Sequence, residues 1–451
     1  MEREKFGSKI GAILAAAGSA VGLGNVWRFP IETGQNGGAA FIIIYVLCIL
    51  VLGLPIMISE FLVGRHTRSN TAGAYRILSE GSPWKWVGRL GVFTGWFILC
   101  YYGVVGAWTM HYTILSAINA FYEAPATEYE HIFEAFVSNP WMPTLWLFLF
   151  IGIIHYVITR GVKSGIEKSA KVMMPTLFVI TVVLTVCSIS LPGASKGVEF
   201  LLKPDWSKVN STVVLEAMGQ AFFSLSLGTA CLCTFGSYFK RDTNLLASAT
   251  QIALLDSGIA ILAGLMIFPA AFSVGVQPDS GPSLIFITLP NVFQQAFGGM
   301  PVAGYVISIM FYALLVFAAL TSTVSMHEIG TAFFHEELKI SRQRAAWILT
   351  SACALLAIFC SFSVGAYSGL QLFGMSLMDF CDFLTAQLML PTGAFLTSIM
   401  LGWFVSEKRV RDEFTNRGTV DVSLFHVWRF TIRFIVPLCI ILIFLHQFSI
   451  L

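Results

Sequence analysis

The chain has 451 residues, of which 56% are hydrophobic and only 12% are charged, and its mean hydropathy is +0.77. Ordinary soluble domains carry about 25% charged residues. This composition excludes a water-soluble globule and predicts an integral membrane protein whose main partner is the lipid bilayer. The formal net charge of +2 provides no basic field, so no nucleic-acid partner is expected.

Eleven apolar stretches are long enough to cross a bilayer as helices, which takes about 20 mostly apolar residues each. The predicted spans are 9–32, 38–64, 87–120, 141–158, 166–191, 213–238, 244–272, 300–334, 344–363, 370–403 and 427–448. The stretch 281–299 is too interrupted to span and is expected to form a re-entrant or external hairpin loop. The sequence therefore predicts an all-α membrane protein with eleven transmembrane helices.

The basic residues agree with this order of spans. Most of the 27 Lys and Arg lie before the first span or in the loops that follow the even-numbered spans. Cytoplasmic loops of membrane proteins carry such an excess of basic residues. The N-terminus is therefore expected in the cytoplasm and the C-terminus outside.

Two spans are interrupted by small and polar residues at mid-membrane depth. The first contains GSAVGLGN (Gly18 to Asn25), and the sixth contains SLSLGTA (Ser224 to Ala230). Glycine permits an unwound segment whose freed carbonyls can bind cations, although close helix packing would also favour small residues here. The first and sixth spans correspond in two groups of five. We therefore predict discontinuous helices 1 and 6 in an inverted repeat, 9–191 and 213–403, with 427–448 as an additional helix of one domain, 1–451.

Ionisable residues also occur inside the apolar spans, where a charge is costly and usually faces a cavity or a partner. They are Arg28, Glu60, Asp256, Asp379 and Asp382. Ion pairs that only orient helices are one explanation of any single residue. Five such residues together favour a pathway through the protein.

Several motifs resemble the bacterial branch of the neurotransmitter:sodium symporter family, including its multi-hydrophobic amino-acid and leucine transporters. They are GSAVGLGNVWRFP (Gly18 to Pro30), NGGAAF (Asn36 to Phe41), GQAFFSLSLG (Gly219 to Gly228), ALTSTVS (Ala319 to Ser325) and MDF (Met378 to Phe380). The resemblance implies a sodium-coupled symporter in the inner membrane of a bacterium, which imports an amino acid by alternating access. It implies a transporter and not an enzyme.

The resemblance further implies two sodium sites. The first would use the Ala20 carbonyl and the side chains of Asn25, Ser224 and Asp256. The second would use the carbonyls of Gly18, Val21 and Ala318 and the hydroxyls of Thr321 and Ser322. Family members that need chloride bind that anion near the first site. Because Asp256 supplies a built-in carboxylate there, no chloride requirement is expected.

The substrate site implied by the resemblance lies at the two helix breaks. It would be lined by Ala20, Gly22, Leu23, Gly24, Ile98, Tyr102, Phe223, Ser224, Ser226, Thr229, Ser322 and Met326. Amine-transporting members carry Asp at the position of Gly22, so Gly22 indicates an α-amino acid whose carboxylate meets backbone N–H groups, sodium and Tyr102. The side-chain pocket has no ionised group, and Thr229 stands where the leucine transporter has an aromatic residue. A neutral hydrophobic or aromatic L-amino acid is therefore expected.

Two gates are implied as well. The outer gate would pair Arg28 with Asp379, and Asp382, one helical turn away, is a rival partner for Arg28. The inner gate would use Arg3, Tyr238 and Glu336. The alternative function is a proton-coupled amino-acid carrier of the same broad fold, which would place Lys or Arg at the second sodium site. The oligomeric state is left open by the sequence.

Overall fold

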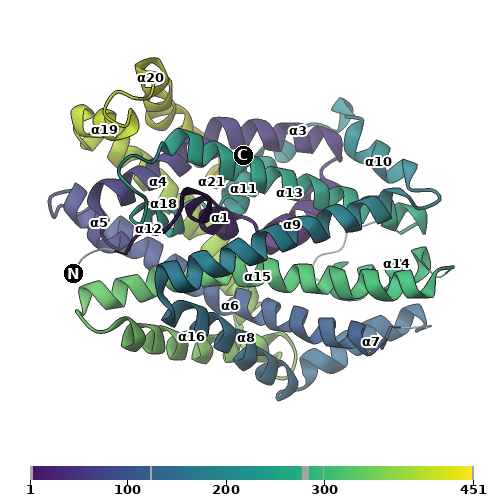
Figure 1. The fold of residues 1–451 in the computed structure, drawn as a ribbon. Helices are drawn as coiled ribbons and strands as arrows, with labels where there is room; N and C mark the ends of the chain where they lie inside the picture. Colours follow the sequence, from purple (N-terminus) through teal and green to yellow (C-terminus); the bar gives the residue numbers. More distant parts are fainter. Residues whose placement is uncertain (1–3, 122–123, 277–283, 298, 449–451) are drawn as a thin grey trace.

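The computed structural model describes residues 4–121, 124–276, 284–297 and 299–448. Within these ranges the fold is helical, apart from a two-residue antiparallel pair of strands, β1 (Gln371–Leu372) and β2 (Met375–Ser376). The long helices run side by side, with α5 and α19 near one end of the molecule and α7, α10 and α14 at the other (Figure 1).

The helices of the first half of the chain follow the predicted order. They are α1 (Lys9–Ala20), η1 (Gly24–Arg28), α2 (Phe29–Gln35), α3 (Ala39–Cys48), η2 (Ile49–Gly53), α4 (Leu54–Thr67), α5 (Thr71–Leu78), α6 (Lys85–Ala117), α7 (Ala126–Ser138), α8 (Met142–Thr159), η3 (Val162–Glu167), α9 (Lys168–Ile189), α10 (Ser195–Leu202) and η4 (Trp206–Lys208). Here η marks a π-helical or, for η4, a 3-10 turn.

The second half contains the remaining helices. They are α11 (Ser211–Ser224), α12 (Cys231–Gly236), α13 (Leu245–Ser273), η5 (Leu284–Thr288), α14 (Leu289–Ala296), α15 (Pro301–Glu337), α16 (Arg342–Val364), α17 (Leu377–Asp382), η6 (Phe383–Met389), α18 (Leu390–Ile399), η7 (Met400–Phe404), α19 (Glu407–Phe414), α20 (Val422–Phe430), η8 (Thr431–Ile435) and α21 (Val436–Gln447).

Nine helices in the described ranges are long and apolar enough to cross a membrane. The pair formed by α1 and Gly24–Gln35, bent by 51°, brings the number to ten if it is one span. The sixth predicted span is divided between α11 and α12 and is not in that set. The count of eleven therefore stays a prediction, as does the inverted repeat of 9–191 and 213–403.

The tenth predicted span begins too early. Residues 371–376 form the β1–β2 hairpin, and the helix starts only at Leu377. Phe373 and Gly374 turn the chain with positive φ angles of 53° and 79°. The hairpin is apolar enough to resemble the start of a span, but its backbone cannot continue into a helix. In the 281–299 region, the described residues form η5 and α14, and Leu284, Ile285 and Phe286 are buried.

Candidate functional site

The first helix is broken where the sequence predicts it. The α1 helix ends at Ala20, and Val21 adopts an extended conformation with ψ of 109°. The Asn25 side chain accepts a hydrogen bond from the Gly22 N–H at 2.9 Å, so it links the unwound residues to the π-helical segment that begins at Gly24. The residues around the break, 15–26, are all buried.

The sixth span is broken more widely. Between α11 and α12 the chain passes through Ser226, Gly228 and Ala230 with φ angles of 52°, 80° and 67°. A Cβ atom at Gly228 would lie 2.1 Å from the Leu390 carbonyl oxygen, so only glycine fits there. Glu60 Oε1 accepts the Gly228 N–H at 2.6 Å. A buried carboxylate of α4 therefore holds the unwound segment in place.

Three of the residues predicted for the first sodium site, namely Asn25, Ser224 and Asp256, lie in mutual contact beside the first break. Asn25 Nδ2 donates to Asp256 Oδ1 at 2.7 Å, and Ser224 Oγ donates to Asp256 Oδ2 at 2.8 Å. The Tyr45 hydroxyl lies 3.1 Å from Ser224 Oγ and 3.4 Å from Asp256 Oδ2. Asp256 is fully buried. No basic side chain lies within ion-pair distance of Asp256 among the described residues, so this carboxylate suits a cation that is not part of the chain.

The hydroxyls predicted for the second site face the first break from α15. Thr321 Oγ1 and Ser322 Oγ lie 3.3 and 3.4 Å from the Val21 carbonyl oxygen. Thr321 Oγ1 also lies 3.0 Å from the carbonyl oxygen of Ala318. A Cβ atom at Gly18 would lie 3.3 Å from Thr321 Cβ, so the two segments are in close contact. These oxygens form a set of the kind that binds a hard cation.

Gly22 faces a small space between Ser322 and Tyr102. A Cβ atom at Gly22 would lie 2.3 Å from Ser322 Oγ and 2.9 Å from the Tyr102 hydroxyl oxygen. A Cβ at Gly24 would likewise lie 3.1 Å from the Phe223 ring. The missing side chains at Gly22 and Gly24 let the backbone approach hydroxyl and aromatic groups, as close binding of a small ligand requires.

The other predicted pocket residues have mixed surroundings. Ile98 and Met326 are buried apolar side chains. The Ser226 hydroxyl donates to the Ser19 carbonyl at 2.9 Å and so links the two breaks. The Thr229 hydroxyl donates to the Ser226 carbonyl at 2.7 Å and accepts the Cys231 N–H at 3.1 Å. Thr229 therefore stabilises the start of α12. The sequence analysis considered Thr229 only as a small residue of the substrate pocket and did not predict this contact.

The site has a cavity of about 300 Å³ on one side. Leu23, Gly24, Arg28, Tyr102, Phe223, Asp379 and Asp382 are among the residues that line it. The Arg28 guanidinium lies 4.5 Å from the centre of the Phe223 ring and 3.6 Å from Glu32 Oε1. The ion pair of Arg28 in this conformation is thus with Glu32, one turn away on its own helix. The i, i+4 spacing could have revealed Glu32 as a partner.

Asp379 has a different partner here. It accepts the Ser376 hydroxyl at 2.7 Å, within the first turn of α17. Arg28 and Asp379 line one cavity without forming the expected pair, among the residues that the structure describes. Asp382 also lines this cavity, so both acidic residues are available if Arg28 turns away from Glu32.

A cluster of polar contacts surrounds Tyr238, beside a second cavity of about 410 Å³ that Tyr238, Glu336 and Arg342 line. The Tyr238 hydroxyl donates to Glu328, which also receives two hydrogen bonds from Arg342. Glu336 accepts the Asn70 N–H at 2.7 Å. Arg3, the third predicted inner-gate residue, lies outside the described residues. Glu328 and Arg342 form a largely buried ion pair in this cluster, which the sequence prediction missed.

A second set of contacts fastens the start of the chain to the fifth span. Glu4 Oε2 accepts the Val162 N–H at 2.7 Å. In the other direction, Glu167 accepts the Gly7 N–H at 2.5 Å and the Ser8 hydroxyl at 2.8 Å. The N-terminal segment and η3 thus each provide a carboxylate that accepts hydrogen bonds from the other segment. We call this pair of contacts, through Glu4 and Glu167, the reciprocal clasp.

Two broken helices bring buried oxygen groups together, and a cavity lies beside each end of this arrangement. This architecture is that of a secondary transporter. The sequence matches the Sodium:neurotransmitter symporter family over residues 3–131 and 115–451. The chain belongs to this family. Its members are transporters and not enzymes, and sodium is the ion that they transport with the substrate.

Individual relatives agree with this assignment. The chain is 37% identical over 448 residues to the sodium-dependent transporter YhdH of Bacillus subtilis, a match that covers 99% of this chain and 98% of YhdH. It is 28% identical to the sodium-dependent serotonin transporter of Drosophila melanogaster, over 98% of this chain and 76% of that protein. The crystal structure of MhsT in complex with L-phenylalanine is 39% identical with a TM-score of 0.90, and the match covers 98% and 99% of the two chains.

Proposed function

We propose that this protein imports a neutral hydrophobic or aromatic L-amino acid together with two sodium ions, without a need for chloride. The observation that carries the proposal is the buried Asp256 carboxylate, held by Asn25, Ser224 and Tyr45 beside the first helix break. A fixed negative charge there can balance sodium without a chloride ion. The likeness to MhsT, whose structure contains L-phenylalanine, supports an amino acid as the substrate.

The substrate would lie at the Gly22 break, with its carboxylate against backbone N–H groups, the first sodium ion and the Tyr102 hydroxyl. Its side chain would extend toward Ile98, Phe223 and Met326, which offer apolar surface. Burying a charged side chain there costs several kcal/mol, so neutral substrates are favoured.

Transport would proceed by alternating access, in an inner membrane with the N-terminus in the cytoplasm. Arg28 would close the outer cavity by moving from Glu32 to Asp379 or Asp382. Tyr238, Glu336 and Arg3 would take part in the inner closure, together with Glu328 and Arg342. One charge crossing 100 mV is worth about 2.3 kcal/mol, and a tenfold sodium gradient about 1.4 kcal/mol more. Two sodium ions would then accumulate a neutral substrate strongly.

The test is binding of labelled Trp and Leu to the purified protein in sodium chloride, sodium gluconate and choline chloride. We expect equal binding in both sodium salts and none in choline. Binding that requires chloride would refute the role of Asp256 as the internal anion. Binding that is independent of sodium would refute the sodium sites and favour proton coupling. The ratio of Trp to Leu affinity then ranks aromatic against aliphatic substrates.

A further inference from the structure

A cavity of about 970 Å³ lies at the end of the molecule that contains α19, and it shares no described lining residue with the cavity beside Tyr102. Its walls come from the end of α4, from Arg241 in the turn between α12 and α13, and from α19 with the loop that follows it. We call it the α19 pocket. Among the described residues, six of its 14 lining residues are Lys or Arg, whereas the cavity beside Tyr102 has Arg28 as its single such residue.

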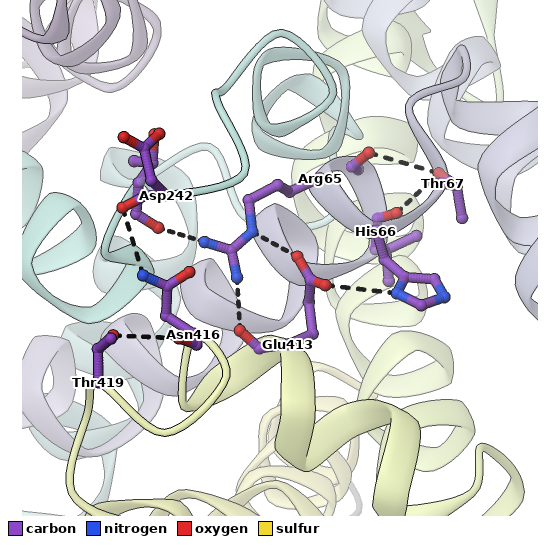
Figure 2. A network of polar contacts seen from close by, with 10 residues as sticks. Arg65, His66, Thr67, Asp242, Glu413, Asn416 and Thr419 are labelled. Carbon is purple, nitrogen blue, oxygen red and sulfur yellow. Dashed lines mark hydrogen bonds and ion pairs between the residues drawn. The ribbon is translucent and has the colours of Figure 1, made fainter.

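The floor of the α19 pocket is a fixed polar network (Figure 2). The buried Arg65 guanidinium donates to the Glu413 side chain and to the carbonyl oxygens of Thr243 and Glu413. Asn416 Nδ2 donates to the Asp242 carbonyl oxygen at 3.3 Å. These contacts join α4, the α12–α13 turn and α19, so the pocket has a defined shape.

Two of the three acidic residues that line the pocket form ion pairs, and the third, Asp412, is exposed. Glu413 pairs with Arg65, and Glu407 lies 3.7 Å from Arg429. Among the cations, Arg409 pairs with Glu80 at 2.9 Å. Four exposed cations have no carboxylate within ion-pair distance in the part of the chain that the structure describes: Arg241, Lys408, Arg411 and Arg417.

These four cations come from segments about 170 residues apart in the chain and line one cavity. An excess of basic residues in cytoplasmic loops is general, but it does not require them to converge. Guanidinium groups match the geometry of phosphate oxygens with paired N–H donors. The ligand of this pocket is therefore expected to carry phosphate.

The position of the pocket indicates the source of the phosphate. Trp403 and Phe404, directly before α19, are 52% and 65% exposed. Val427 and Phe430 of α20, which follows α19 in the chain, are also exposed. Exposed aromatic and aliphatic side chains on membrane-spanning segments face lipid, and Trp is enriched at the level of the headgroups. The pocket thus opens where lipid headgroups lie.

We propose that the α19 pocket binds the headgroup of an anionic phospholipid from the leaflet at this end of the molecule. The headgroup phosphate contacts Arg411 and Arg417 on one wall and Arg241 on the other. Arg241 lies in the turn after α12, and α12 begins at the break at 225–230. A lipid bound to Arg241, Arg411 and Arg417 therefore also connects the α12–α13 turn to α19. Binding of the lipid does not depend on the transport activity proposed above.

The test uses the full-length protein with two double variants. Arg411→Gln/Arg417→Gln removes two pocket cations, and Lys168→Gln/Arg344→Gln removes two exposed cations outside the pocket. The protein is equilibrated with phosphatidylglycerol or phosphatidylcholine of matched acyl chains, and bound lipid is counted by native mass spectrometry. Each basic residue near an anionic lipid surface contributes roughly a fivefold factor. We expect about 30-fold weaker phosphatidylglycerol binding in the pocket variant and wild-type binding in the control.

Equal loss in both double variants would overturn the proposal, because it would reflect general charge. So would phosphatidylcholine binding equal to that of phosphatidylglycerol. Inorganic phosphate is titrated in parallel; if it displaces the lipid at matched phosphate concentration, the pocket serves a free anion and the lipid assignment is wrong. Should the first double variant misfold, Arg241→Gln/Lys408→Gln tests the same cavity from other positions, with thermal unfolding as the check of folding.

Discussion

Replacing Gly22 by alanine adds a single methyl group at the point where the backbone meets Ser322 and Tyr102. The added Cβ would lie 2.3 Å from Ser322 Oγ and 2.9 Å from the Tyr102 hydroxyl oxygen. Both separations are shorter than a carbon–oxygen contact allows, so one of these groups must move. Ser322 Oγ lies 3.4 Å from the Val21 carbonyl, and moving it disturbs the proposed second sodium site.

The expected magnitude follows from the cost of overpacking. Inserting a methyl group into a closely packed site costs about 1–3 kcal/mol, which corresponds to about 5- to 150-fold in affinity. We expect Gly22→Ala to weaken sodium-dependent binding of Leu and Trp by a factor in this range, with a higher sodium concentration for half-saturation. Equilibrium binding of labelled substrate over a sodium titration measures both.

Gly219→Ala is the matched control, because a Cβ at Gly219 would meet nothing within 4 Å. This variant lies in α11, close in sequence to the second break, and should bind like the wild type. Gly219→Ala should unfold at the wild-type temperature, whereas Gly22→Ala should unfold at a lower temperature, because the added methyl group also crowds the folded protein. Wild-type affinity in Gly22→Ala would refute the assignment of this space to the substrate and sodium.

Three further variants test contacts around the site. Glu60→Gln replaces a charge-assisted hydrogen bond at the second break by a neutral one and should lower the free energy of unfolding by about 1–2 kcal/mol; an unchanged urea or thermal midpoint would contradict this. Glu167→Gln should increase hydrogen exchange in residues 4–8 several-fold, whereas Glu199→Gln, an exposed control, should not. The pKa of Glu413 is lowered overall: burial raises it, but His66 and Arg65 favour the carboxylate more strongly. Its stabilisation is thus present above the ordinary glutamate pKa and lost as pH falls through the lower folded value. The difference in stability between wild type and Glu413→Gln should therefore vanish on acidification from about pH 7 to 3, and a constant difference would refute the coupling.

Both helix breaks could be predicted because small residues in an apolar run have a direct physical meaning. Gly18 to Asn25 and Ser224 to Ala230 both contain the observed interruptions. The start of the tenth span could not be placed correctly, since the hairpin around Phe373 is apolar and its turn has no strong polar signal. Hydropathy measures transfer to lipid and does not report a backbone turn.

Residues of the candidate site could be predicted where they belong to motifs that resemble those of the family. Asn25, Ser224 and Asp256 are far apart in sequence, and only the resemblance placed them together before the structure did. The pairing of Arg65 with Glu413 has no such signal, because 348 residues separate them. Long-range ion pairs depend on how helix ends meet in space, and composition and periodicity do not specify that.

The reciprocal clasp between the N-terminal segment and η3 has a kinetic consequence. When the bond from Glu4 to the Val162 N–H breaks, the bonds from Glu167 to Gly7 and Ser8 still hold the partners together. Because the two segments stay tethered, the broken bond re-forms at a high effective concentration. Loss of the Glu4 bond alone is therefore rapidly reversed. Detachment of the N-terminal segment from η3 therefore requires both sets of bonds to break together, and fraying at Glu4 alone does not free it.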